Sequence, residues 1–477
     1  MIGSASVWVN SKVGRETLPG LGLAVLVGLL LALLPLRWAA LLVAAGIVLV
    51  ATLVWPQFGV LLLVPAVPFG ALRQVRLGVM NVGAAEVLVL LVLVAWLMRM
   101  VARREIRWQW PPLSLPLLAF VGGLLLSTLG AVSLQHSVKE VVKWLEVLAL
   151  YLFVANEFDE RWSKALIFVV LGTGAVAALH GIYQFLFQVG PEDFVLFGRF
   201  MRASGTFEQP NPYGGYLGLT LPLAVGLAGA AIVPMGQRVK GWWLAWAAGC
   251  GALMLVALVM TWSRGAWLGF GAALAAMVLA VVARSGRAAV LGTVFALLAA
   301  YILLAGGLTR LPPAIGRRFG DFMPYLGLTD VRGVEVTDAN FAVLERVAHW
   351  QSALAMWTDH PWLGVGIGNY EPVYGRYALP LWPLPLGHAH NYYLNIAAET
   401  GLLGLAAYLI LWGTALLSAW RAARQTSGWT WGVALGILGL LAHLSVHNLF
   451  DNLYVHALYL QVALLLALLP ILTRRSQ

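Results

Sequence analysis

Residues 242–282 read WWLAWAAGCGALMLVALVMTWSRGAWLGFGAALAAMVLAVV, two apolar runs joined by a short turn that contains the only charged residue of the stretch, Arg264. Each run approaches the ~20 residues that an α-helix needs to cross the hydrocarbon core of a bilayer. Because that core offers no water to backbone N–H and C=O groups, such runs form helices. The stretch therefore predicts two membrane-spanning helices connected at one membrane surface.

The composition of the whole chain extends this prediction to a polytopic membrane protein. Of the 477 residues, 61% are hydrophobic and 10% are charged, whereas soluble proteins are about half apolar and about a quarter charged. Lipid must therefore solvate much of the protein surface. The net charge of +10 is explained by membrane topology and requires no nucleic-acid partner. The single cysteine, Cys250, lies in an apolar run, which excludes a disulfide framework within the chain.

Further apolar runs predict an all-α bundle of about 12–14 transmembrane helices. One of them, Phe58–Leu72, is a candidate for a re-entrant segment because Pro65 and Pro68 interrupt it. The predicted spans are Leu21–Leu34, Trp38–Trp55, Phe58–Leu72, Ala84–Leu97, Leu113–Val132, Val141–Val154, Trp162–Phe187, Gly214–Val233, Trp242–Thr261, Ala266–Val282, Ala289–Ala305, Tyr392–Ala419, Trp429–Leu449 and Tyr454–Leu472.

Basic residues gather in alternate connections between these spans, which predicts cytoplasmic N- and C-termini and places residues 306–391 outside the cytoplasm. The chain then divides into N-terminal transmembrane helices (1–305), a large external loop (306–391) and C-terminal transmembrane helices (392–477). Within the loop, apolar residues at helical spacing predict a helix that begins after the N-cap Asp338 and ends at His360-Pro361.

Arg202, Arg264 and His390 come from segments far apart in the sequence, yet all are predicted to lie at the outer membrane interface. Two guanidinium groups that face one cavity repel each other unless an anion joins them. A diphosphate is well suited to this, because the planar fork of arginine matches phosphate oxygens bidentately. The alternative is that each arginine extends to the interface and pairs with lipid headgroups.

Several motifs resemble those of the O-antigen ligase and polymerase family. They are RASGTF at 202–207 with Pro210-Asn211, Ser263-Arg264-Gly265, HPWLGVG at 360–366 and HAHNYYLNIAAETGLLG at 388–404. The ligases carry His, then Asn, Ser or Gln, nine residues, Gly, two residues, and Gly, Thr or Tyr. His390-Asn391 with Gly401 and Gly404 satisfies this pattern, whereas His388 is followed by alanine. The resemblance extends from about Val141 to the C-terminus and is closest to the ligases.

The resemblance implies an inverting glycosyltransferase of the membrane-embedded GT-C type. It would transfer a glycan from a polyprenyl (undecaprenyl) diphosphate carrier to a hydroxyl of lipid A-core or another surface acceptor. The reaction takes place on the outer face of the cytoplasmic membrane, without nucleotide, metal or other cofactor. Arg202 and Arg264 would stabilise the leaving diphosphate, and His390 would act as general base. A repeat-unit polymerase with the same donor chemistry is the first alternative. A lipid-linked glycan flippase is the second, and the oligomeric state stays open.

Other polar residues near the predicted outer surface are secondary candidates for binding the diphosphate or glycan. They are Lys139, Lys143, Glu208, Asn211, Arg346, Arg376, His388, Asn391, His447 and Asp451. Lys139 and Lys143 lie beside Glu140 and Glu146, so neutralised pairs at a helix end are the default interpretation and a binding role is the alternative. Glu208 is a candidate to orient Arg202.

Two further patterns favour structural roles. His443, His447 and Asp451 are spaced to share one helix face. For these residues, a supporting position behind the cavity is favoured over a metal site. The glycines at 364, 366 and 368 lack the strand and helix of a phosphate-binding loop and predict a turn after the external helix.

Overall fold

The computed structural model describes residues 28–29, 32–70, 75–77, 80–104, 108–196, 198–232, 239–284, 330–337 and 340–474. Within them the protein is helical, apart from the short hairpins β1–β2 (Val75–Leu77 and Met80–Val82) and β3–β4 (Val195–Leu196 and Phe200–Met201). The all-α polytopic prediction is confirmed. The predicted span Ala289–Ala305, most of Leu21–Leu34, residues 306–329 of the loop and Asp338 lie outside the described residues.

The other predicted spans coincide with helices of the bundle. Among the described residues, eight helices are long and apolar enough to cross a membrane: α2 (Leu36–Val54), α4 (Ala84–Arg103), α7 (Glu160–Phe187), α8 (Pro210–Ile232), α9 (Gly241–Met260), α10 (Arg264–Val282), α15 (Tyr392–Gln425) and α16 (Gly428–His447). Shorter apolar helices are α3 (Pro56–Gly70), α5 with the 3-10 turn η1 (Ser114–Ser127 and Thr128–Gly130), and α17 with α18 (Leu458–Leu466 and Leu468–Thr473). Helix α3 continues through both of its prolines.

Helix α6 (Leu134–Glu157) is long but carries Lys139, Glu140, Lys143 and Glu146 in its outer half. Charged side chains inside a membrane protein face a partner or a polar cavity, since exposure to hydrocarbon is costly. In α6 they line a cavity that is described below.

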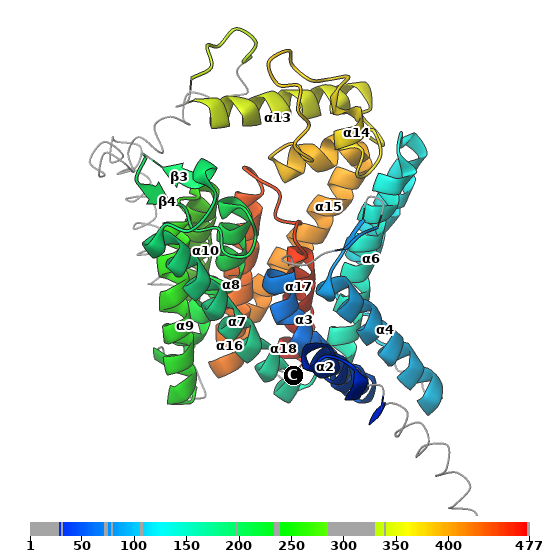
Figure 1. Ribbon diagram of the computed structural model, residues 1–477, viewed down its shortest axis with the longest axis vertical. Coiled ribbons are helices and arrows are strands. Elements are labelled where there is room, and N and C mark those ends of the chain that lie inside the picture. Colours follow the sequence, from blue (N-terminus) through cyan, green and yellow to red (C-terminus); the bar gives the residue numbers. More distant parts are fainter. Residues whose placement is uncertain are drawn as a thin grey trace, which may run out of the picture.

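Helices α8 and α16 form the centre of the bundle and are packed closely through glycines (Figure 1). A Cβ atom added to Gly226 of α8 would lie 2.2 Å from the carbonyl oxygen of Gly432 in α16. Small residues let helix backbones approach in this way in membranes. The same packing encloses His443 of α16, whose ring fills the space beside Gly218 of α8 and Gly269 of α10.

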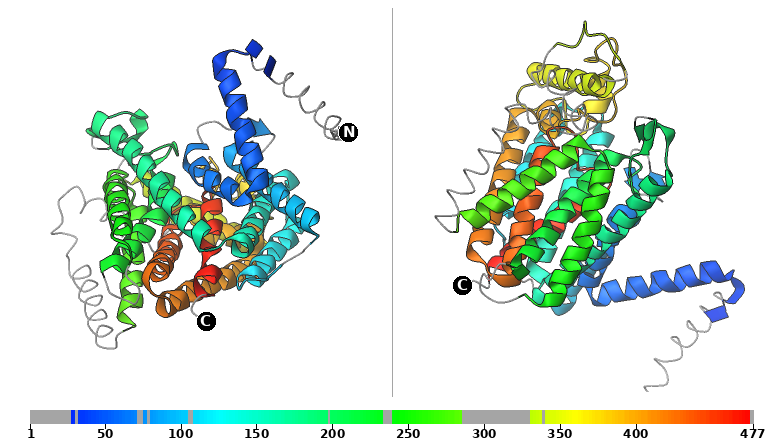
Figure 2. Two further views of the ribbon diagram at one scale, coloured as in Figure 1. Left: turned by 90° about the horizontal axis from the view of Figure 1, so that it is seen from below. Right: turned by 90° about the vertical axis from the view of Figure 1, so that its left-hand side faces the viewer.

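Helix α13 (Phe341–Asp359) lies across one end of the bundle, next to the short helix α14 (Tyr370–Tyr374) (Figures 1 and 2). The predicted external helix is therefore present, and its N-cap residue is Asn340. It ends at Asp359 because Pro361 disfavours a helical backbone at the preceding residue, His360. Residues 361–368 then form turns, in agreement with the prediction for the glycine-rich stretch.

Segment 361–366 is attached to a break in α15. Gly401 has a φ of +62° and interrupts the helix, so the neighbouring carbonyl and amide groups lose their partners within the helix. The carbonyls of Ala398 and Glu399 accept from the amides of residues 365 and 366, and the amides of residues 402 and 403 donate to the carbonyls of Pro361 and Trp362. The external subdomain is thus joined to a membrane helix by backbone hydrogen bonds.

We expect Gly401→Ala to destabilise the protein strongly. The left-handed backbone at this position costs a non-glycine residue about 1–3 kcal/mol, and the new Cβ would lie 2.2 Å from the backbone carbon of Trp362. Gly413→Ala is the matched control, because Gly413 lies in the same helix and its Cβ would meet nothing within 4 Å. Thermal unfolding of both purified variants tests the expectation, and equal melting temperatures would contradict it.

Candidate active site

Arg202, Arg264 and Arg346 lie around one cavity of about 350 Å³ at the end of the bundle that carries α13. They come from the loop after β4, the first turn of α10 and the external helix α13. We call this space the arginine cavity. Its lining residues are Asp193, Leu196, Arg202, Asn211, Trp262, Ser263, Arg264, Gly265, Leu268, Ala342, Arg346, His447, Phe450 and Asp451.

The side chain of Arg202 is oriented by groups that follow it in the chain. Its Nε donates to the carbonyl of Thr261 at 2.9 Å, and its Nη2 donates to Oδ1 of Asn211 at 3.1 Å. Asn211 stands in the first turn of α8, so the RASGTF and Pro-Asn motifs meet in space. A guanidinium that is held in this way needs little reordering to bind an anion.

Gln184 of α7 holds the loop that follows Arg202. Its Oε1 accepts from the backbone amides of Ser204 (3.1 Å) and Gly205 (2.7 Å), and its Nε2 donates to the carbonyl of Gly205 (3.0 Å). Thr206 donates its hydroxyl to the carbonyl of Pro68 in α3. Sequence reasoning did not identify Gln184, because one glutamine in an apolar helix carries no spacing signal.

Arg264 is the first residue of α10, and Ser263 before it is the N-cap residue, whose Oγ accepts from the amide of Ala266. The unpaired amides at a helix N-terminus carry partial positive charge, which adds to the attraction for an anion. The glycine that follows is required by packing, since a Cβ on Gly265 would lie 3.0 Å from the His447 ring.

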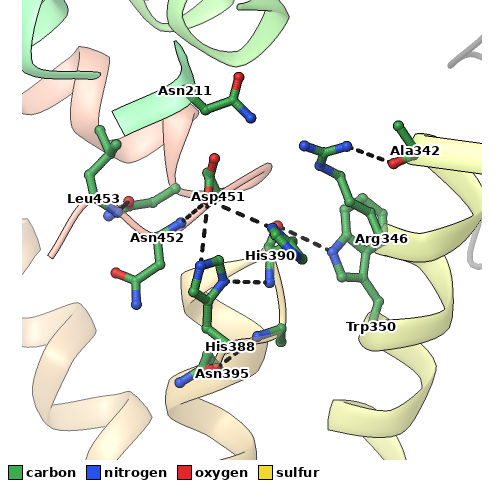
Figure 3. A network of polar contacts seen from close by, with 12 residues as sticks. Asn211, Ala342, Arg346, Trp350, His388, His390, Asn395, Asp451, Asn452 and Leu453 are labelled. Carbon is green, nitrogen blue, oxygen red and sulfur yellow. Dashed lines mark hydrogen bonds and ion pairs between the residues drawn. The ribbon is translucent and has the colours of Figure 1, made fainter. Parts of the chain in front are cut away.

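Arg346 points from α13 towards the same cavity and donates to the carbonyl of Ala342 at 2.6 Å (Figure 3). Among the described residues, three guanidinium groups therefore face two carboxyl groups, those of Asp193 and Asp451, around this cavity. The excess positive charge and the bidentate geometry of arginine suit a phosphorylated ligand.

Asp451 lies beside two histidines that the sequence separates from it by about sixty residues. Its Oδ1 is 3.7 Å from Nδ1 of His390 and 3.8 Å from Nε2 of His388 (Figure 3). The predicted shared helix face of Asp451 with His443 and His447 is wrong, because α16 ends at His447 and Asp451 falls in the following turn. His443 and His447 do contact each other along the helix, edge to face, with 3.4 Å between ring nitrogens.

The environment of Asp451 keeps its carboxyl group ionised. Burial raises the pKa of this group, but the adjacent His390, His388 and His447 lower it by more, so that the pKa lies well below its usual range. A buried carboxylate that contacts imidazole rings fixes their orientation and stabilises their protonated forms.

His388 and His390 differ in which ring nitrogens are already engaged. The backbone amide of His390 donates to Nδ1 of His388 at 3.1 Å. A backbone amide is always a donor, so this Nδ1 is unprotonated and the ring proton of neutral His388 lies on Nε2, which faces Asp451. Burial is the main cause that lowers the pKa of His388 to about 3. Neither nitrogen of His388 is therefore free to accept a proton from a substrate.

Both ring nitrogens of His390, in contrast, are buried and have no hydrogen-bond partner among the described residues. The ring packs edge-on against His388 and His349, with centroids 4.5 and 5.7 Å away, and it does not itself line the arginine cavity. Its backbone φ is +51°. A buried nitrogen without a partner is costly, which favours a position completed by a ligand.

Asn391, which follows His390, is the N-cap residue of α15. Its Oδ1 accepts from the amides of Tyr393 and Leu394 at 3.0 and 3.1 Å. This bond fixes the start of the helix directly after the histidine. Arg376, in contrast, is exposed after α14 and lines neither the arginine cavity nor the larger cavity described next.

Lys139, Lys143, Glu208 and His388 lie around a larger cavity of about 640 Å³, which we call the glutamate cavity. Lys143 forms an ion pair with Glu140, so the interpretation of this helix end as neutralised pairs is correct for Lys143. Glu208, a candidate to orient Arg202, faces this cavity. The groups that hold Arg202 include Asn211 and Thr261. The complete lining is Glu86, Lys139, Glu140, Val142, Lys143, Glu146, Glu208, Glu371, Leu386, Gly387, His388, Asn452, Tyr454, Val455, His456, Ala457 and Tyr459.

His388, His390 and Asp451 each offer one potential metal-ligating atom, and these atoms all lie within 4.8 Å of one another. Two imidazoles and a carboxylate are a ligand set that Zn²⁺ accepts. The same geometry also serves a histidine whose orientation is set by an aspartate.

One comparison with protein families finds a match to part of the chain. Residues 249–409 match the family model described as O-Antigen ligase. The matched segment includes Arg264, Arg346, His388 and His390, together with the external segment that is bonded to α15, whereas Arg202 and Asp451 lie outside it. No curated protein matches the chain.

Proposed function

We propose that this multi-pass membrane protein, of which residues 249–409 match the O-antigen ligase family model, transfers a glycan from polyprenyl diphosphate to an acceptor hydroxyl. The observation that carries the proposal is the meeting of Arg202 and Arg264 at one cavity whose wall includes Asp451, the partner of His390. The donor is undecaprenyl diphosphate carrying the glycan, and the acceptor is lipid A-core or another surface hydroxyl.

The diphosphate of the donor occupies the arginine cavity in this proposal. Arg202 and Arg264 bind its oxygens and oppose the negative charge that grows as the glycosidic bond breaks, a contribution of about 2–4 kcal/mol for each preorganised donor. Arg346 and the amides at the start of α10 add to the same field. Carriers of this kind leave readily as diphosphates, so charge stabilisation is the main task of the site.

His390 assists the attack by accepting a proton. The acceptor oxygen forms a bond to the anomeric carbon while the bond from that carbon to the diphosphate oxygen breaks. The bonding pair stays with the diphosphate, and the hydroxyl proton passes to Nε2 of His390. Transfer must be concerted with attack, because an imidazole with a pKa near 6.5 cannot ionise an alcohol beforehand. In-line displacement inverts the anomeric centre.

The proposed location is the outer face of the cytoplasmic membrane, with both termini in the cytoplasm. Support comes from the concentration of basic residues in alternate connections and from the position of the arginine cavity beneath α13. A flippase is disfavoured, since a transporter is expected to place its ionisable groups near the middle of the bilayer.

We expect the purified full-length protein to transfer the glycan in the presence of a chelator and without any nucleotide. The donor is a polyprenyl diphosphate-linked glycan, and the acceptors supplied in parallel are lipid A-core and a second molecule of the donor. Elongated lipid A-core or a doubled donor glycan, separated by electrophoresis, distinguishes a ligase from a polymerase. Loss of transfer in chelator, with return on adding a divalent metal, would show that the His388, His390 and Asp451 group binds a catalytic ion instead.

A further inference from the structure

The glutamate cavity has a charge balance opposite to that of the arginine cavity. Among the described residues that line it, five glutamates face two lysines. Its volume of about 640 Å³ falls in the range of small-ligand sites. A cavity of this size with an excess of carboxylates inside a membrane bundle is costly unless it serves a ligand.

The lysine that lies deepest in the cavity is engaged by neighbouring groups. Lys143 pairs with Glu140, donates to the carbonyl of Tyr454 at 3.3 Å and lies 5.8 Å from the ring centre of Tyr459. Tyr459 in turn donates its hydroxyl to Glu146 at 2.9 Å. Lys139, Glu208 and Glu371 are exposed at the cavity. Because Glu140 is paired with Lys143, the two exposed glutamates outnumber the one exposed lysine and determine what the cavity accepts.

The glutamate cavity and the arginine cavity lie on different sides of the histidine–aspartate cluster. Asp451 lines the arginine cavity, while its neighbour Asn452 and its contact His388 line the glutamate cavity. In Figure 3, Asn211 and Arg346 lie above Asp451, and His388 and Asn452 lie below it. A nucleophile that displaces a diphosphate in line must approach from the side opposite the leaving group. The glutamate cavity has the position required for that approach.

We propose that the glutamate cavity binds the uncharged, hydroxyl-bearing end of the acceptor glycan. This inference rests on the proposed function and adds the chemical class of the acceptor to it. Sugar hydroxyls are donors, and hydrogen bonds to ionised carboxylates are stronger than those to neutral acceptors. A phosphorylated sugar would meet like charges and be excluded, so the charges of the cavity also keep the donor diphosphate on the arginine side.

The test uses full-length protein in nanodiscs, a polyprenyl diphosphate-linked glycan as donor, and two lipid-anchored oligosaccharide acceptors. These probes are identical except that one ends in a hexose and the other in the corresponding hexose phosphate. The variants are Glu208→Gln, Glu371→Gln and the double substitution. Glu335→Gln, on an exposed residue that lines neither the arginine cavity nor the glutamate cavity, is the matched control.

We expect the double variant to raise the KM for the hexose-ended acceptor about tenfold, the effect of weakening charge-assisted hydrogen bonds. The KM for the donor stays unchanged in the double variant, and the KM for the acceptor stays unchanged in the control variant. The unaltered protein uses the phosphate-ended probe at least ~10-fold less well than the hexose-ended probe. An unchanged acceptor KM in the double variant, or equal use of both probes, overturns this inference and leaves the proposed function standing. Transfer to neither probe by the unaltered protein overturns both.

Discussion

Replacing His390 by alanine is expected to lower the turnover of glycan transfer by ~10²–10⁴-fold, the usual contribution of a positioned general base. The reason is that His390 has ring nitrogens that are not engaged in hydrogen bonds, while Asp451 is 3.7 Å from its Nδ1. Binding of the donor is expected to remain, because the diphosphate is held by arginines. Steady-state kinetics with saturating donor measures the change in kcat.

His388→Ala is the matched comparison for this experiment. Its Nδ1 already accepts from the backbone of His390, and its Nε2–H faces Asp451. Its loss therefore removes a contact that positions His390 and lowers turnover less than the loss of His390 does. Equal residual activity in the two variants would show that the assignment of His390 as the base is wrong.

Substitution of Arg202 or Arg264 is expected to have the second large effect. Each alanine variant should lose ~10²–10³-fold in kcat, the loss seen when one preorganised donor to a developing charge is removed. Substitution by lysine should restore little activity, because an ammonium group cannot reproduce the two parallel hydrogen bonds of a guanidinium. For Arg202 the loss has a further cause, since only a guanidinium reaches both Thr261 and Asn211.

The control for the arginine variants is Arg332→Ala. Arg332 forms an exposed ion pair with Asp330, with 68% of its side chain accessible, and such pairs contribute little to stability. The activity of the Arg332→Ala variant should match that of the unaltered protein. If Arg202→Lys and Arg264→Lys retained full activity, a site that depends on bidentate diphosphate binding would be excluded.

Helix positions in this protein were predictable because a membrane span needs a long apolar run and leaves few alternatives. Segments such as Trp242–Thr261 and Ala266–Val282 needed no knowledge of the partners that each helix packs against. Helix α6 was harder to predict as a membrane-spanning helix, because its outer half carries four charged residues. These residues fit a membrane protein because they line a cavity.

The arrangement around the site was only partly predictable. The motifs identified Arg202, Arg264 and His390, and phosphate chemistry gave a reason for the two arginines to meet. Local spacing misplaced Asp451, because four-residue intervals indicate a helix face only while the helix continues, and α16 ends at His447. Asn211 and Arg346 were also predicted as candidates, whereas Gln184 acts through contacts with the loop at Ser204 and Gly205, about twenty residues away, which no local pattern encodes.

The attachment of the external subdomain to the break at Gly401 has a consequence for biosynthesis. Segment 361–366 has its backbone partners in α15, and Asp451 follows α16, so both depend on residues that are synthesised well after α10. A nascent chain that has inserted only the helices up to α10 already holds both motif arginines but lacks the aspartate. The proposed site is therefore complete only once the residues that follow α16 have been synthesised.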